Sequence, residues 1–180
     1  MSSQQLILDK ITNVLKATPT NLEADLLKIV DEAGRIFIGG AGRSGLVSRF
    51  FAMRLVHSGY KVSMVGEIVT PSIQSGDLFI VISGSGETET LLPLVRKAKS
   101  QGAKLVVISM KAKSTMADLA DLVVPVGANN TDLFAKTHGM PMGTTFELST
   151  LIFLESAIAT LVDQKGLTEE GMRAIHANLE

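Results

Sequence analysis

The sequence contains no cysteine and no tryptophan, and only one of its 180 residues is tyrosine. Without cysteine, a disulfide scaffold, a thiol nucleophile and a thiolate metal site are all excluded. An excess of charge of one sign is also lacking, because 17 Lys and Arg residues face 18 Asp and Glu residues, for a formal charge of -1. We therefore expect neither a nucleic acid nor an anionic membrane as partner, and any anionic ligand must be held locally.

The N-terminal segment also lacks the charged, apolar and small-residue regions of a signal peptide, so we expect a cytoplasmic protein. What is present is a hydrophobic share of 46% with only 4% aromatic residues, which predicts an aliphatic core. A length of 180 residues is enough for one well-buried domain and too short for two.

Short β-rich runs alternate with helical stretches from Arg35 onward. The runs IFI, FIVI and LVVI are apolar without alternation, as in parallel strands whose two faces are covered by helices. Strands are predicted over 35–40, 60–66, 77–83, 103–109 and 121–126, with helices over 45–59, 89–102 and 115–120 between them. The pattern predicts an α/β fold, a three-layer αβα sandwich around a five-stranded parallel sheet of flavodoxin-like order. It forms one domain over 35–180, with an N-terminal helical appendage over 1–34 packed on it.

A long helix is predicted to begin near Thr144, after a polar loop over 127–143 that lies near the ligand or an interface. It is apolar on nearly every side up to Val162, which predicts a helix buried all round. In a small domain such a helix indicates a subunit interface, so we expect a homodimer or homotetramer. A short terminal helix with its N-cap at Thr168 follows.

The first glycine-rich loop, 40–45, reads GAGRSG between a strand and a helix and matches the dinucleotide fingerprint G-x-G-x-x-G. Glu67 ends the second predicted strand, close to where a ribose-binding acid would lie. A dinucleotide-binding oxidoreductase is therefore one possible function, although the chain has no separate substrate domain.

A second loop of the same kind, 83–88, reads SGSGET and again lies between a strand and a helix. Its glycines let the backbone approach a ligand, and the hydroxyls of Ser83, Ser85 and Thr88 add donors. Both loops border one crevice when the first and third strands are neighbours. A small phosphorylated ligand between the two loops is the simplest interpretation; a plain serine and glycine turn with Thr88 as a cap is the alternative.

Five separate blocks, GAGRSG, FAMRLVHSGYKVSMVGEIVTP, ISGSGETE, PMGTTFE and HANLE, resemble the 6-phospho-3-hexuloisomerase family of the sugar isomerase (SIS) fold. The resemblance implies conversion of 3-hexulose 6-phosphate to fructose 6-phosphate in the ribulose monophosphate route of formaldehyde assimilation. It also implies 3-hexulose-6-phosphate synthase as functional partner, and neither metal nor redox cofactor. By position it implies these substrate-binding residues: Ser44, Gly84, Ser85, Gly86, Glu87, Thr88 and Glu89.

Glu147 falls where that family has its proton acceptor. Moving a carbonyl from C3 to C2 needs a base that removes a proton beside the carbonyl and returns one at C3, through a 2,3-enediol. The same residue also completes the capping-box pattern Thr144-x-x-Glu147, in which it would only bond the N-cap amide. Another SIS isomerase, or a sugar-phosphate sensor in which Glu147 only caps, therefore stays open.

The histidines and arginines carry weaker signals. His176 could reach a pocket of its own chain or of a neighbouring subunit and shuttle a proton during sugar ring opening; a solvated surface histidine is the alternative. His57 at a helix end favours a structural role. His138 receives no assignment, and Arg43 and Arg54 either attract phosphate or pair with surface acids.

Overall fold

Five parallel strands form one sheet in the order β2-β1-β3-β4-β5. The computed structural model describes residues 2–127, 140 and 143–179 of the chain. The strands are β1 (Ile36–Gly40), β2 (Val62–Met64), β3 (Leu78–Ile82), β4 (Lys104–Ser109) and β5 (Leu122–Pro125). The predicted parallel sheet and its flavodoxin-like order are confirmed, and the proline-containing strand is at an edge, where a missing amide is tolerated.

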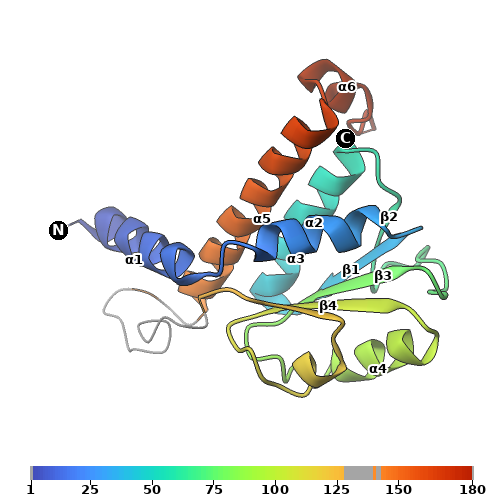
Figure 1. The fold of residues 1–180 in the computed structure, drawn as a ribbon, viewed down its shortest axis with the longest axis horizontal. Helices are drawn as coiled ribbons and strands as arrows, with labels where there is room; N and C mark the ends of the chain where they lie inside the picture. The colour runs from blue at the N-terminus through green and yellow to red at the C-terminus, as the bar shows by residue number, and fades with distance from the viewer. Residues whose placement is uncertain (1, 128–139, 141–142, 180) are drawn as a thin grey trace.

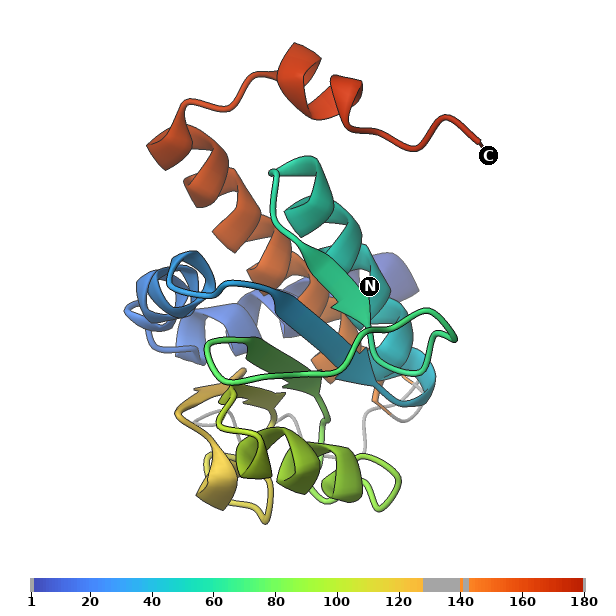
Figure 2. The same ribbon diagram turned by 90° about the vertical axis from the view of Figure 1, so that its right-hand side faces the viewer.

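Helices cover both faces of this sheet (Figures 1 and 2). One face packs against α2 (Leu22–Asp31), α3 (Gly42–His57) and α5 (Thr144–Lys165), and α1 (Ser3–Ala17) packs on α5. The other face packs against α4 (Leu92–Ser100) and the 3-10 turn η1 (Ala117–Leu119). The last helix, α6 (Glu169–Ala174), lies beyond the ends of α3 and α5 in both views, and Thr168 caps it as predicted.

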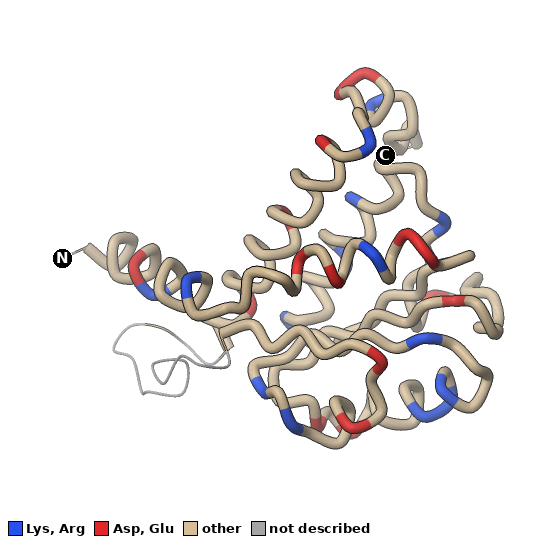
Figure 3. The backbone as a smooth tube through the Cα atoms, viewed as in Figure 1, with Lys and Arg blue, Asp and Glu red and all other residues tan. Residues whose placement is uncertain are grey.

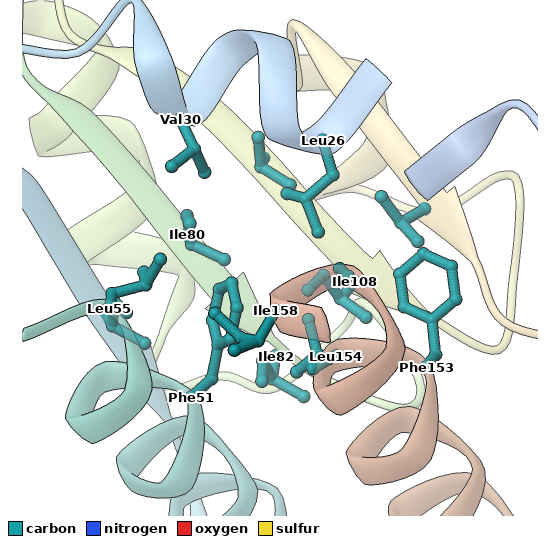
Figure 4. Packing of buried hydrophobic residues seen from close by; sticks show 14 of the residues in the cluster. Leu26, Val30, Phe51, Leu55, Ile80, Ile82, Ile108, Phe153, Leu154 and Ile158 are labelled. Atoms are coloured by element: carbon teal, nitrogen blue, oxygen red, sulfur yellow. The ribbon is translucent and has the colours of Figure 1, made fainter. Parts of the chain in front are cut away.

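Successive residues of each strand enter opposite halves of the core. Ile38 and Ile80 belong to the cluster shared with α2, α3 and α5 (Figure 4), whereas Phe37 and Phe79 contact the α4 side. Both halves are closed to solvent, which explains why these strands are apolar without alternation. The sheet therefore presents only its ends to a ligand.

The N-terminal helices share this core. Leu26 and Val30 of α2 are fully buried in the cluster that includes Ile80 and Ile158. The break between α1 and α2 falls at residues 18–21, which include Pro19. The division of the chain at residue 34 stays a prediction.

Two predicted helices differ from the structure at their ends. The segment 115–120 forms only the single turn η1, because Ala120 is already extended on the way into β5. Helix α4 begins at Leu92 rather than Glu89, because Pro93 is compatible only with the first turn of a helix.

Helix α5 is not buried all round in the single chain. Phe153 and Leu154 are buried, whereas Ile152 on the other side is 43% exposed. Among the described residues α5 alone has the length and hydropathy of a membrane span, and half of that apolar stretch is buried inside the protein. Core packing therefore accounts for most of its apolar character.

One polar cluster joins the C-terminal ends of α2 and α5 to the segment after α3. The Tyr60 hydroxyl donates to Asp31, and Lys165 lies 2.9 Å from the same carboxylate. Partial burial, followed by the bond to Asp31, raises the pKa of Tyr60 to about 12. The Tyr60 phenol therefore keeps its proton to a higher pH than an ordinary tyrosine.

Candidate active site

The carboxyl ends of β1 and β3 lie at the point where the chain order of the sheet reverses. From β1 the chain crosses to β2 on one side and then to β3 on the other. Ligands of open parallel sheets bind at this switch point. The two glycine-rich loops follow these two strands, as the sequence predicts.

The first loop joins strand to helix with almost no spacer. A Cβ on Gly45 would stand 2.8 Å from the carbonyl oxygen of Gly40, so the backbones of α3 and β1 touch here. The N-cap of α3 is Ala41, which has no side-chain acceptor. The amides of the first turn, including that of Ser44, are therefore left to bind an external anion.

The second loop is shaped by its own hydroxyl groups. The Ser83 hydroxyl accepts from the Gly86 amide at 3.1 Å and lies 2.9 Å from the Thr88 hydroxyl. The Ser85 hydroxyl accepts from the Glu87 amide at 3.1 Å. Ser83 is buried, whereas Ser85 and Thr88 are half-buried. Ser83 thus organises the loop, and the side chains of Ser85 and Thr88 are partly exposed.

The loop after β4 packs against the second glycine-rich loop. Gly86 has φ +66° and a Cβ there would lie 2.1 Å from the Ser114 hydroxyl, so only glycine fits. Glu87 accepts from the Thr115 amide at 2.7 Å, and this bond lowers the pKa of Glu87. Glu87 therefore braces the loop, and Glu89 is exposed beyond it.

Glu147 lies in the first turn of α5 with 8% of its surface exposed. The N-cap of this helix is Gly143, in the left-handed conformation with φ 79°, so Thr144 is already helical. The capping-box interpretation of Thr144 and Glu147 is therefore wrong. Instead Arg43 of the first loop donates from Nε to Glu147 Oε2.

The start of α5 also touches the second loop. A Cβ on Gly84 would stand 3.2 Å from the Phe146 ring, which shows how closely α5 approaches the loop. The structure therefore brings together Ser44 and Arg43, the 83–88 loop and the Glu147 carboxylate. Sequence reasoning left Arg43 undecided between phosphate and a surface acid, and its contact with Glu147 adds it to the candidate site; its place beside Ser44 in the first loop was the available signal.

His176 is not part of this assembly within one chain. Its ring stacks on that of His57 with centroids 4.9 Å apart, beside a cavity of about 340 Å³ lined also by Arg54 and Arg173. His57 ends α3, whereas Ser44 lies in its first turn. The 16 residues of α3 span about 24 Å, so His176 lies roughly a helix length from Glu147.

The remaining candidates have other partners. Arg54 pairs with Glu155, and Glu67 pairs with Arg49 at 2.7 Å, which gives the proposed ribose-binding acid a structural role. His138 and most of the predicted loop over 127–143 lie outside the described residues. Within the described part of the chain, no group of three or more His, Asp or Glu residues is gathered to hold a metal.

Charges of both signs are spread along the described chain (Figure 3), in keeping with a locally held anion. Two loops with open amides and hydroxyls, facing one buried carboxylate, define a phosphosugar-binding α/β protein with a group able to transfer protons. A cavity of about 470 Å³ between the α1–α2 junction and α5 contains none of these residues.

The chain belongs to the SIS domain family, whose model matches residues 29–152. It is 75% identical over 177 residues to the 3-hexulose-6-phosphate isomerase of Methylomonas aminofaciens, covering 98% of each chain. It is 40% identical to the Bacillus subtilis protein of the same name, covering 89% of each. The family predicted from the sequence is thereby confirmed.

A solved structure is also similar over the whole chain. It is a Methanococcus jannaschii protein, 36% identical, with a TM-score of 0.88 and complete coverage of both chains. The molecular function inferred from that crystal structure is 3-hexulose-6-phosphate isomerase. The fold described above is thus the SIS fold.

Proposed function

We propose that this protein is a 3-hexulose-6-phosphate isomerase, which converts 3-hexulose 6-phosphate to fructose 6-phosphate. The observation that carries the proposal is the Glu147 carboxylate, buried at the crevice and held by an arginine of the first loop. A carboxylate that only capped α5 would bond an amide of the first turn instead. The relatives of the same name, one of them 75% identical, agree with this activity.

The phosphate is expected to bind the two loops. Its oxygens would accept from the open amides at the start of α3, beside Ser44, and from the hydroxyls of Ser85 and Thr88. The backbone of Gly84 and Gly86 permits close approach. These groups bind substrate and product alike, so they anchor the ligand while its carbonyl moves.

Glu147 is the proposed base. It removes the proton from C2, and the electron pair moves toward the C3 carbonyl oxygen, which gains a proton to give the 2,3-enediol. The O2 proton then leaves, the C2 carbonyl forms, and Glu147 returns its proton to C3. One carboxylate therefore serves both carbon-bound proton transfers.

His176 can serve this site only from a second copy of the chain. Helix α3 presents three large apolar side chains one turn apart, Leu46, Phe50 and Met53, each 47% exposed or more. Phe50 lies at the middle of α3, with Leu46 and Met53 on either side of it. An antiparallel contact of two such helices buries this stripe and brings His176 of one copy toward Glu147 of the other.

Complementation between inactive variants tests this arrangement. Glu147→Gln and His176→Gln are mixed after partial unfolding and refolded together. In a mixed dimer one of the two sites regains both residues, so about one quarter of the wild-type rate is expected. If activity stays at the level of the separate variants, His176 does not act across subunits.

The pathway follows from the substrate. 3-Hexulose-6-phosphate synthase, acting on formaldehyde and ribulose 5-phosphate, is the proposed functional partner, which places the protein in the ribulose monophosphate route. The cytoplasmic location and the dimer or tetramer expected from the sequence stay predictions.

The direct test supplies formaldehyde and ribulose 5-phosphate to that synthase, adds this protein and follows fructose 6-phosphate through linked dehydrogenase steps. Formation of fructose 6-phosphate that depends on the protein supports the proposal. Accumulation of hexulose phosphate without product would exclude it. Glu147→Gln is expected to lose about 10³-fold in kcat while it retains fructose 6-phosphate binding.

A further inference from the structure

Three arginines of α3 form ion pairs, and they differ in the exposure of their partners. Arg49 and Arg54 pair with glutamates whose side chains are 49% and 39% exposed. The partner of Arg43 is Glu147, whose side chain is only 10% exposed. Exposed pairs contribute little, whereas an arginine bonded to a buried carboxylate fixes the direction of that carboxylate.

The two oxygens of Glu147 have different surroundings. Oε2 accepts from Nε of Arg43. Oε1 lies beside Gly143, where even a Cβ would approach it to 2.9 Å. Glycine at 143 thus leaves space around Oε1, while Arg43 occupies the other oxygen.

We propose that Arg43 is a positioning residue for proton transfer: it holds Oε2 of Glu147 and directs Oε1 at the substrate carbon. The inference rests on the proposed function, since it assigns a role beside the same base. Arg43 does not need to touch substrate. Its guanidinium prevents rotation of the carboxylate, and proton transfer between carbon atoms is sensitive to that direction.

A role in phosphate binding is the competing explanation, because Arg43 precedes Ser44 and its side chain is 60% exposed. The two roles affect different constants. Loss of a positioning group lowers kcat and leaves KM nearly unchanged, whereas loss of a phosphate ligand raises KM.

The test compares Arg43→Gln and Arg43→Lys with wild type in the synthase-coupled assay. For Arg43→Gln we expect kcat to fall about 10²-fold and KM to change less than about threefold. Arg43→Lys should recover part of kcat, because an ammonium group can still donate to Oε2. A KM at least tenfold higher with kcat retained would overturn the proposal in favour of phosphate binding, and unchanged constants would also overturn it.

Two further variants separate positioning from general damage. Arg35 pairs with another buried acid, Asp77, at 2.6 Å, and both residues lie at the amino ends of β1 and β3, opposite the ends that the loops follow. Arg35→Gln should therefore lower the thermal midpoint but change kcat less than about twofold.

Adding Arg43→Gln to Glu147→Gln should change the residual rate less than about threefold, because the effect of Arg43 acts through Glu147. A full additional 10²-fold loss would show that Arg43 acts independently. Absence of isomerase activity in wild type would instead refute the proposed function itself.

Discussion

The two glycine-rich loops look alike in sequence but are built differently. In the loop over 40–45 the glycines let α3 and β1 approach backbone to backbone, and the helix begins at once. In the loop over 83–88 the chain makes a separate hydroxyl-bonded turn, and α4 begins only at Leu92. The glycines of the first loop therefore serve the packing of α3 on β1, whereas the glycines of the second loop serve the shape of the loop itself.

This difference shows that a glycine pattern in a sequence does not by itself indicate the structural role of the glycines. The fingerprint G-x-G-x-x-G at 40–45 fits a dinucleotide site equally well, and only the second loop and Glu147 favour a phosphosugar. Substitutions in each loop should consequently separate stability from binding.

Gly45→Ala should have the largest effect on stability. The new Cβ would meet the Gly40 carbonyl oxygen at 2.8 Å, and neither backbone can move without parting α3 from β1. We expect the free energy of unfolding to fall by about 3 kcal/mol. Urea titration followed by circular dichroism measures it; a change below about 1 kcal/mol would contradict close packing here.

Gly86→Ala should affect activity more than stability. Its positive φ costs about 1 kcal/mol for alanine, and the Cβ would displace the Ser114 side chain, which is buried and accepts a hydrogen bond from the Ala117 amide. We expect the loop over 83–88 to move while the rest of the fold is kept, so KM should rise at least tenfold. If Gly86→Ala unfolds the protein as readily as Gly45→Ala, the two loops do not differ as described.

Thr88→Val should give a smaller, local effect. It removes one half-buried hydroxyl and keeps the side-chain volume. We expect KM to rise about tenfold with kcat retained, which corresponds to about 1.4 kcal/mol of binding. Thr90→Val, an exposed threonine outside the loop, is the control; equal KM values for both variants would refute the assignment.

The smallest effect concerns the brace between Glu87 and Thr115. The bond to the Thr115 amide lowers the pKa of Glu87 in the folded protein, so the ionised carboxylate contributes fully to folding stability above the ordinary pKa of 4.5. This contribution to stability is lost as the pH falls below 4.5 and through the pKa of the folded protein. The thermal midpoint of Glu87→Gln should therefore be lower than that of wild type at pH 7, and the difference should shrink below pH 4.5. A difference independent of pH would argue against the carboxylate.

The sheet order and both loops could be predicted because they depend on local patterns: unbroken apolar runs and glycine clusters at strand ends. Local spacing alone left two interpretations of Glu147, since Thr144 and Glu147 match a capping box and only the left-handed Gly143 moves the cap one residue earlier. The pairing of Arg43 with Glu147 joins residues 104 positions apart, so no local pattern contains it. The burial of α5 was overpredicted because composition does not show which side faces solvent.

The cluster of Tyr60 with Asp31 and Lys165 has an optical consequence. Tyr60 is the sole tyrosine and the chain has no tryptophan, so near-ultraviolet absorption and emission report this one ring. It lies three residues after His57, at the end of α3 that the proposed contact carries toward a second copy. Tyr60 is thus an intrinsic chromophore near the proposed contact, and its signal can be used to follow assembly without an added label.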